Sequence, residues 1–365
     1  MSNKALKIII YASGIVCFLL FLSVRYLPLF NLFMADKYME GYWENKPYGE
    51  LYYFNMINNF KENDMPPYHI KYRFSKDMPS INESDILVFG DSFFDFSRMP
   101  TFPERLSWQL NKKVYFERYD IPLKSLARKN YRNKTPKILI FESSERYVST
   151  RFYNAHRYYE RWRRESALSR NYKKALSFVF NPNIEKMFNY MLFQSYFTKP
   201  VYSALATFKF NKFGYIPKST PIYTFHKGQP WLFLGESVDE GIRETSFYHQ
   251  FQPEDIDLYC NNIANLSEKL REHYNLYLIF IVLPSKYTVY HKLVNNHKYN
   301  NFIPAIYKGL EERKVPVVKV FNDFMNSDDL MFYPTDTHWT PAGLEIALKK
   351  TIQVMDSVKT IHNIP

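Results

Sequence analysis

Short apolar runs that alternate with helical patterns constrain the fold of this chain most strongly. The runs at 85–92 (DILVFGDS), 137–142 (KILIFE) and 275–284 (NLYLIFIVLP) are nearly continuous and end in polar or turn residues. Such runs are typical of strands buried on both faces, as in a parallel sheet. Residues 253–274 lead into the last run and carry apolar side chains at helical spacing. The alternation predicts an α/β fold, with a mostly parallel sheet covered by helices on both faces.

Weaker patterns add further elements to this prediction. Thr101 and Thr340 each stand where a helix N-cap is expected, and each is closely followed by a proline that suits the first helical turn. We therefore predict further helices at 101–110, 301–313 and 340–356, and further strands at 113–117 and 315–321.

The N-terminus predicts a membrane anchor. Residues 8–24 carry no charge, and Lys4 and Lys7 precede them. Together with the apolar stretch that follows, the segment is long enough to cross a hydrocarbon layer of about 30 Å. The lysines favour an N-terminus inside the cell, although Arg25 weakens this bias. A cleaved signal peptide is the alternative, but no small-x-small cleavage site follows the apolar run. We expect residues 1–35 to form a cytoplasmic tip and an uncleaved transmembrane anchor.

The charge of the chain points to an acidic partner. Its formal net charge is +12 and its pI is about 9.3. Nucleic acid, an anionic membrane surface and an acidic polysaccharide all fit such an excess. If an N-terminal anchor places the rest of the chain outside the cytoplasm, nucleic acid is not expected as its partner. The two cysteines, Cys17 in the apolar run and Cys260 in the body, make an internal disulfide implausible.

The body divides into regions of different composition. Residues 36–80 are aromatic and polar and are interpreted as a connecting region, and residues 81–150 carry the first predicted strands. Residues 151–228 form an insert that begins with a stretch dense in Arg and Tyr, and residues 229–365 carry the later strands and helices. The arginines of the insert, Arg157, Arg161, Arg163 and Arg164 among them, either pair with the insert's own acids and aromatic rings or form a wall that attracts an anionic ligand or lipid head groups.

Ser92 and His338 are the candidate catalytic residues. The Gly-Asp-Ser at 90–92 follows a buried strand, where ligands bind in open α/β sheets. A serine hydroxyl needs a base before it can act as a nucleophile, and its own backbone N–H can donate to an oxyanion. His338 is the candidate base, and Asp336 would hold its ring in one tautomer. In an extended loop, side chains two residues apart point the same way, so the Asp-x-His spacing suits this pairing.

Each signal has a structural alternative when it is taken alone. Ser92 could occupy an ordinary strand-end turn, and His338 could be a surface histidine. Asp336 and His338 could also be a metal pair, but a third ligand is not apparent in the sequence. Together, one serine after the first strand and one Asp-x-His before the last helix favour nucleophilic catalysis by Ser92.

This layout resembles that of the SGNH (GDSL-type) hydrolases. The sequence DTHW at 336–339 is similar to that of the SGNH-hydrolase-like proteins of alginate O-acetylation, which work on the periplasmic side of bacterial membranes. Further similar stretches are PWLFLGES at 230–237, VLPSKYTVY at 282–290 and PKILIFESSERY at 136–147. The resemblance covers about 81–147 and 229–350, in an order that looks circularly permuted, because here the Ser half comes first. It implies an SGNH-hydrolase-like α/β/α sandwich.

The resemblance also implies roles for individual residues. Ser92 would be the nucleophile, His338 the base and Asp336 the residue that orients His338. Trp339, Lys286 and Arg146 match family positions and are candidate substrate contacts, although packing under the loop explains Trp339 equally well. The Asn-bearing oxyanion block of typical SGNH hydrolases is not evident.

The function implied is O-acetyl transfer to a polysaccharide outside the cytoplasm of a bacterium, by a protein anchored once in the inner membrane. A partner of the membrane-bound O-acyltransferase type would supply the acetyl group, and no metal or bound cofactor is implied. Two alternatives stay open: a carbohydrate acetyl esterase with the same triad, and a non-catalytic polysaccharide-binding or assembly protein.

Overall fold

The computed structural model describes residues 3–23, 32, 37–39, 42–44, 48–62, 78–96, 98–118, 121–132, 135–153, 195–238, 247–249 and 251–364. The chain divides into two compact units. The smaller one, called here the N-terminal unit, comprises 1–46, 56–58 and 163–215, and the larger one, the sheet unit, comprises 47–55, 59–162 and 216–365.

A parallel sheet of five strands forms the centre of the sheet unit. The order is β4-β3-β5-β8-β9, and every neighbouring pair is parallel. The strands are β3 (Ile86–Gly90), β4 (Val114–Arg118), β5 (Lys137–Ser144), β8 (Leu276–Leu283) and β9 (Val317–Val318). The predicted α/β fold with a mostly parallel sheet is confirmed, and the strands of 81–150 and of 229–365 share this one sheet.

The strand order places a switch point between β3 and β5. The chain passes from β3 outward to β4, then returns across β3 to β5 and continues outward through β8 and β9. In open doubly wound sheets, ligands bind beside the carboxyl ends of the strands where the order reverses. Asp91 and Ser92 follow β3 directly, and Glu145 and Arg146 follow β5. Both predicted segments of the Ser half therefore end at the switch point.

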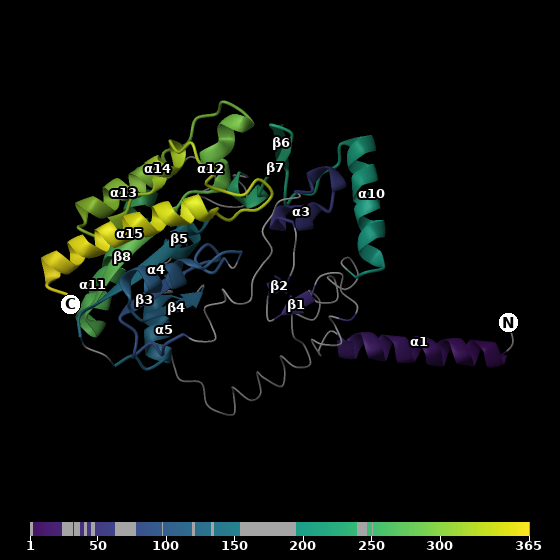
Figure 1. Ribbon diagram of the computed structural model, residues 1–365, viewed down its shortest axis with the longest axis horizontal. Helices are drawn as coiled ribbons and strands as arrows, with labels where there is room; N and C mark the ends of the chain where they lie inside the picture. The colour runs from purple at the N-terminus through teal and green to yellow at the C-terminus, as the bar shows by residue number, and fades with distance from the viewer. Residues whose placement is uncertain are drawn as a thin grey trace. The chain divides into compact units, whose positions relative to one another are not determined.

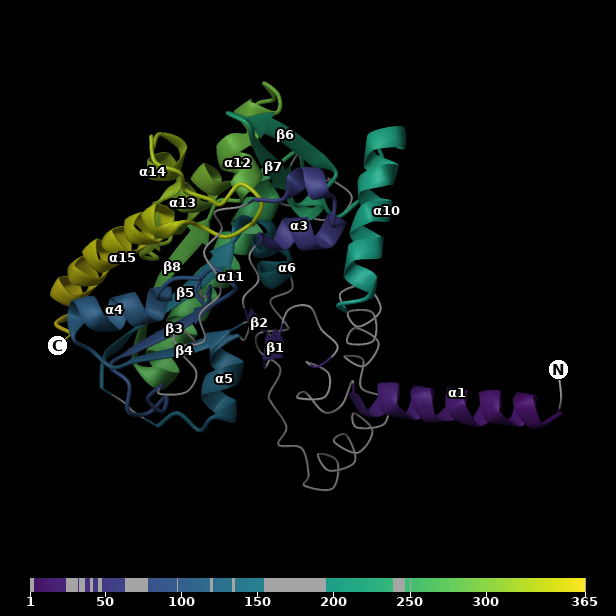
Figure 2. The same cartoon turned by 45° about the vertical axis from the view of Figure 1, so that its right-hand side comes forward.

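Helices cover both faces of the sheet and complete an α/β/α sandwich. Val88, Ile140 and Ile279 lie in register on neighbouring strands and belong to a core shared with α4 (Phe102–Leu110) and α15 (Pro341–His362). Figures 1 and 2 both show these two helices side by side on one face. The alternate residues of the strands point into a second core, shared with α5 (Pro122–Arg128), α6 (Val148–Phe152), α11 (Pro253–Tyr274) and α13 (Phe302–Glu312). Two faces of buried side chains explain why the strands are almost continuously apolar.

The predicted caps of α4 and α15 are present. Glu104 accepts from both the backbone N–H and the hydroxyl of Thr101, which closes a capping box at the start of α4. Thr340 accepts from the N–H of Gly343 at the start of α15. The short elements that complete the sheet unit are α12 (Lys286–Tyr290), α14 (Phe321–Met325), η3 (Glu145–Tyr147), η4 (Gly235–Ser237) and η5 (His291–Leu293).

Part of the predicted connecting region belongs to the sheet unit. Helix α3 (Glu50–Asn55) begins beside the loop at 333–339, where the N–H of Leu51 donates to the carbonyl of Thr335 at 3.0 Å. A Cβ on Gly49 would lie 2.1 Å from that same carbonyl oxygen, so only glycine allows this approach. Interpreting 36–80 as a simple connection was therefore wrong for the residues around α3. Residues 63–77 lie outside the described part of the chain.

The predicted end of the insert, at residue 228, falls inside a hairpin. Strands β6 (Ile222–His226) and β7 (Gln229–Phe233) pair antiparallel, and the turn between them holds Lys227 and Gly228 at φ of 51° and 77°. Positive φ at both central residues is the geometry of a two-residue hairpin. The hairpin belongs to the sheet unit, so the boundary of the insert lies before β6. Residues 154–194, including the Arg-rich stretch, lie outside the described residues.

The N-terminal unit contains α1 (Asn3–Ser23), β1 (Lys37–Met39), β2 (Tyr42–Glu44) and α10 (Thr198–Phe213), with η1 (Asn58–Phe60) at its boundary with the sheet unit. Strands β1 and β2 pair antiparallel. Over the residues that the structure describes, no helix is both long and apolar enough to cross a membrane. The predicted span 8–24 extends past the last described residue of α1.

We predict that Gly90→Ala destabilises the sheet unit. A Cβ at this position would lie 2.9 Å from Glu142 Oε2 and 3.0 Å from the ring of Phe94, both of which are buried. Overpacking of this kind costs about 1–3 kcal/mol, which urea unfolding followed by circular dichroism would detect. Gly14→Ala is the control, because a Cβ there meets nothing within 4 Å. Equal midpoints for the two variants would contradict the prediction.

Candidate active site

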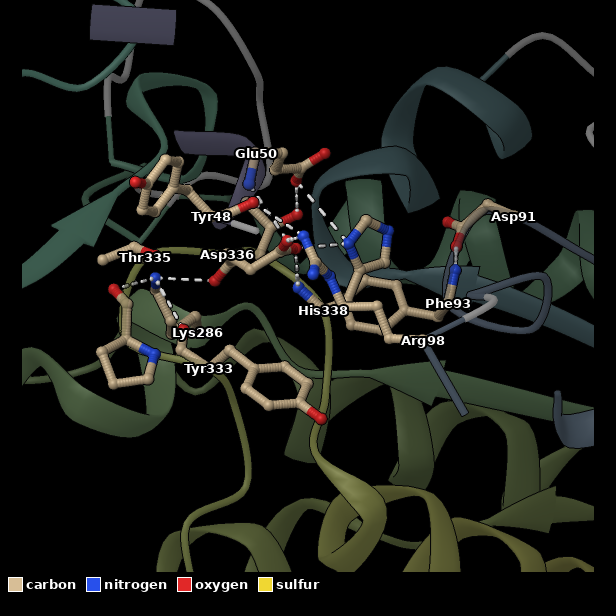
Figure 3. A network of polar contacts seen from close by, with 12 residues as sticks. Tyr48, Glu50, Asp91, Phe93, Arg98, Lys286, Tyr333, Thr335, Asp336 and His338 are labelled. Atoms are coloured by element: carbon tan, nitrogen blue, oxygen red, sulfur yellow. Dashed lines mark hydrogen bonds and ion pairs between the residues drawn. The ribbon is translucent and has the colours of Figure 1, made fainter. Parts of the chain in front are cut away.

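Asp336 and His338 form a buried pair in the loop before α15. His338 Nδ1 lies 2.6 Å from Asp336 Oδ1, and the backbone N–H of His338 donates to the same oxygen at 3.1 Å. His338 is 5% exposed and Asp336 is fully buried. Because Nδ1 faces the carboxylate, Nε2 remains to exchange a proton with a substrate or a nucleophile (Figure 3).

The turn that carries Ser92 packs against the His338 ring. Phe96 stacks on the imidazole, with ring centroids 4.3 Å apart and planes 10° apart, and the Phe93 ring lies 5.4 Å away. Ser92 precedes Phe93 and is partly exposed. Among the described residues, no hydrogen bond joins Ser92 to His338. The fold thus brings the loops that hold the two candidate residues together at one edge of the sheet, although about 246 residues of sequence separate them.

Asp336 is held from its second carboxylate oxygen as well. Oδ2 accepts from the backbone N–H of Glu50 at 3.0 Å and lies 3.8 Å from the guanidinium of Arg98, which also donates to the carbonyl of Tyr48 at 2.7 Å. Burial by itself would raise the pKa of Asp336, but the contact with His338 and the Arg98 charge outweigh it and hold the pKa below its usual range. Asp336 is therefore a carboxylate at neutral pH and can stabilise a protonated His338.

Lys286 holds the loop at 333–339 through hydrogen bonds to its backbone. Its Nζ donates to the carbonyls of Asp336 at 2.8 Å, Pro334 at 3.0 Å and Tyr333 at 3.3 Å (Figure 3). Burial lowers the pKa of the Lys286 amine to about 7, although nearby carboxylates, Asp336 first, act in the opposite direction. Three carbonyl acceptors match the three N–H donors of an ammonium group. These contacts favour a positioning role for Lys286 over the substrate contact that the resemblance implied.

Trp339 is enclosed by the core. It is fully buried, and its ring lies against those of Phe93, Phe94 and Phe102 at centroid distances of 5.6, 5.9 and 6.3 Å. A side chain with no exposed surface cannot touch a substrate in this conformation. Packing under the loop, the alternative raised from the sequence, accounts for this residue.

Arg146 reaches a small cavity beside the loop. The cavity holds about 10 Å³, close to the room that one water molecule needs. It is lined by Phe93, Ser144, Arg146, Leu234, Ser237, Ser285, Lys286, Tyr287 and Thr337. The Arg146 guanidinium lies over the Tyr147 ring at 5.0 Å, and its Nε is buried without a hydrogen-bond partner among the described residues. Of the three candidate substrate contacts, Arg146 is the one whose surroundings still allow that role.

A buried acidic pair shapes the turn after β3. The backbone N–H of Asp91 donates to Glu142 Oε2 at 2.6 Å, and the carboxylate of Asp91 accepts from the N–H groups of Phe93 at 3.0 Å and Ser144 at 3.3 Å. Burial, with the Asp91 charge next, raises the pKa of Glu142 well above its usual value. These bonds tie the ends of β3 and β5 together next to Ser92, which follows Asp91 in the chain.

Glu50 is a neighbour of the candidate pair that the sequence did not reveal. Its Oε1 lies 3.7 Å from His338 Nδ1 and accepts from the hydroxyl of Thr337, while its backbone holds Asp336. Nothing near Glu50 in the sequence signals this role, because its partner lies 286 residues away.

Glu50 also supplies the third carboxylate or imidazole that a metal site would need at Asp336 and His338. The three ligand atoms lie within 4.8 Å of one another. The folded chain therefore brings a third possible ligand to Asp336 and His338, which the sequence did not show. However, Nδ1 and Oδ1 are only 2.6 Å apart. Two ligands of a tetrahedral zinc ion would be about 3.3 Å apart, given bonds of about 2.0 Å. The observed spacing is that of a hydrogen bond, and this conformation fits a catalytic pair better than a metal centre.

A larger hollow than the cavity at Arg146 lies elsewhere, against α13, α14 and α15. It holds about 840 Å³, and charged side chains line much of it. Its lysines pair with acids nearby, as Lys350 does with Asp323 at 3.0 Å and Lys319 with Glu311. No candidate catalytic residue lines this hollow.

We predict that Lys286→Met loosens the Asp336–His338 loop and lowers kcat for an acetyl ester by on the order of 10- to 100-fold, because a misplacement of about 1 Å can cost a factor of this size. Lys308→Met, at an exposed position of α13, is the control and should leave kcat unchanged. Equal kcat values for the two variants would show that the three carbonyl contacts do not position the pair.

The lowered pKa of Lys286 also predicts a pH dependence of stability. The unfolded chain binds this proton with a pKa near 10.5 and the folded chain with a pKa of about 7, so between these values the unfolded state holds more protons. Raising the pH from 7 to 10 should therefore stabilise wild type relative to Lys286→Met, by up to a few kcal/mol. Urea unfolding of both proteins across this range tests the prediction, and a constant difference would contradict it.

Comparisons with known proteins agree with this geometry over part of the chain. Residues 228–365 match a family model described as the SGNH hydrolase-like domain of the acetyltransferase AlgX. The match confirms the resemblance for the region that contains Lys286, Asp336 and His338, and Ser92 lies outside it. No curated protein matches the chain. One crystal structure aligns with 77% of this chain over 99% of the length of that structure's chain, at 11% sequence identity. Its TM-score is 0.30, which is too low to support a shared fold.

Proposed function

We propose, from the match of residues 228–365 to the SGNH hydrolase-like acetyltransferase family, that this protein is a polysaccharide O-acetyltransferase. The observation that carries the proposal is the 2.6 Å contact between His338 Nδ1 and Asp336 Oδ1, in a loop packed against the turn that holds Ser92. A carboxylate, an oriented imidazole and a nearby serine are the parts that acyl transfer requires.

The first half of the reaction would form an acetyl-enzyme. His338 Nε2 takes the proton of Ser92 Oγ as this oxygen attacks the acetyl carbonyl of the donor. The backbone N–H of Ser92 donates to the oxyanion, and Asp336 stabilises the imidazolium. His338 then returns the proton to the donor's leaving oxygen as the bond between that oxygen and the acetyl carbon breaks.

In the second half, a sugar hydroxyl would take the place of the donor. His338 accepts the hydroxyl proton, the sugar oxygen attacks the acetyl carbon, and Ser92 leaves with the proton.

The proposal extends to the location of the protein. We place the sheet unit outside the cytoplasm of a bacterium, held to the inner membrane by the N-terminal segment around α1. Most of the described side chains of α1 after Lys7 are apolar and exposed, and Lys4 and Lys7 precede this apolar run. An acetyl donor made inside the cell must cross the membrane, so a partner of the membrane-bound O-acyltransferase type would deliver it.

A labelled acetyl donor distinguishes the proposed function from its rivals. The enzyme would be incubated with nitrophenyl [¹⁴C]acetate, with and without oligosaccharides of different charge, and both free acetate and acetylated sugar would be measured. Transfer to at least one oligosaccharide, at the expense of free acetate, is the expected result. Acetate release that no acceptor changes would identify an esterase, and no turnover at all would identify a binding protein.

A further inference from the structure

Helix α10 carries an exposed apolar stripe. Phe197, Val201, Leu205 and Phe208 lie at successive helical spacings of four, four and three residues, and their exposures are 80%, 69%, 48% and 53%. The stripe is bordered by Lys212, on the same face, and by Lys209. Soluble monomers rarely expose a continuous apolar surface of this kind without a partner.

The opposite face of α10 is the one that packs within the N-terminal unit. Ser203 is buried and its hydroxyl donates to the carbonyl of Met56 at 2.8 Å and contacts Asn58 Oδ1 at 2.8 Å. Thr207, one turn further, accepts from the N–H of Asn58 at 2.9 Å. Because Ser203 and Thr207 fix the orientation of the helix, the stripe is directed away from this attachment and not into a core.

The charge around the stripe points to an anionic partner. From Ser195 to Thr220 the sequence has no Asp or Glu, and its lysines are Lys199, Lys209, Lys212 and Lys218. Helices with Phe and Leu on one face and lysines beside them are typical of segments that lie in the plane of a membrane interface. Lysines near an anionic leaflet are attracted to its surface potential.

The length of α10 excludes a spanning arrangement. Its sixteen residues would cover about 24 Å, which is shorter than a hydrocarbon layer of about 30 Å. The helix ends at Gly214, whose φ of 62° suits a left-handed C-cap, so it does not continue. A helix of this length can bury an apolar stripe only by lying along a surface.

We propose that α10 binds the interface of an anionic lipid bilayer, with Phe197, Val201, Leu205 and Phe208 inserted among the head groups. The helix forms a second membrane contact beside the proposed anchor around α1 and limits how freely the N-terminal unit turns on the membrane. This contact does not depend on the acetyl-transfer activity.

A fluorescent probe on the stripe tests the proposal in the full-length chain. Phe208→Cys, in a background with Cys17→Ser, would be labelled with nitrobenzoxadiazole; the remaining cysteine, Cys260, is buried. Vesicles of phosphatidylcholine with phosphatidylglycerol should shift the emission to the blue and raise its intensity on the order of twofold or more, because the probe leaves water. Brominated acyl chains in the same vesicles should then quench it.

Matched variants separate local contact from general recruitment. The same label at Lys308→Cys on α13, whose side chain is 81% exposed, should not respond. In the Phe208→Cys protein, Lys209→Glu with Lys212→Glu should weaken the response on the order of fivefold or more, since each lysine contributes to attraction by anionic lipid.

Two outcomes would overturn the proposal. One is a probe whose emission does not shift to the blue although the protein is bound to anionic vesicles. The other is a probe that is already blue-shifted without lipid and depends on protein concentration, which would assign the stripe to contact between copies of the chain.

Discussion

Ser92→Ala is expected to lower kcat/KM for nitrophenyl acetate by on the order of 10⁴-fold or more, since loss of one member of a catalytic triad typically costs this much. The substitution removes only the Oγ that would carry the acetyl group. The turn itself is held by Asp91 and Glu142, through backbone N–H groups that the substitution leaves in place. The fold should therefore survive while the chemistry stops.

Intact-mass spectrometry adds a second readout for Ser92. Wild type incubated briefly with the ester should show the mass of one acetyl group, and Ser92→Ala should not. Ser357→Ala, at an exposed position of α15, is the matched control. Activity of Ser92→Ala within tenfold of wild type, or acetylation at another residue, would remove Ser92 from the mechanism.

Asp336→Asn is expected to cost on the order of 10⁴-fold in kcat, because an amide cannot stabilise the imidazolium and can favour the wrong tautomer of His338. The volume of the side chain is nearly unchanged. The pKa of Asp336 is held below its usual range, so the carboxylate is present throughout the pH range in which His338 would act as a base. The loss should therefore be similar from mildly acidic to alkaline pH.

Asp329→Asn, in the exposed loop before the site, is the control for Asp336→Asn and should retain full activity. Combining Ser92→Ala with Asp336→Asn should lower kcat little further than either change alone, because residues that act as one unit are not additive. Independent, multiplying losses would contradict a shared mechanism, as would an Asp336→Asn enzyme within tenfold of wild type.

The alternating strands and helices were determined by the sequence itself. Each depends on the spacing of apolar residues within one segment, and that spacing is the same whatever the rest of the chain does. The caps at Thr101 and Thr340 are local for the same reason. The contact between Asp336 and His338 also follows from a spacing of two residues in one loop, and the structure shows it at 2.6 Å.

The surroundings of that pair were decided only by the tertiary structure. Glu50 meets Asp336 across 286 residues, and Lys286 reaches the loop from the end of β8. Neither contact leaves a periodic or local signal, because each exists only after the strands have been ordered and the loops closed. For the same reason the sequence suggested a plain connection for the residues around α3, which in the folded chain border the Asp336 loop.

Burial likewise separated residues that the sequence grouped together. From the sequence, Trp339, Lys286 and Arg146 were equivalent candidates for substrate contacts. The packed core encloses Trp339 among aromatic rings, and three carbonyl oxygens occupy the Lys286 amine. Arg146 lines the cavity together with Lys286, and its buried Nε has no hydrogen-bond partner among the described residues. Which side chain stays accessible depends on how α4, α15 and the loop at 333–339 pack against one another, and no segment of the sequence determines that packing alone.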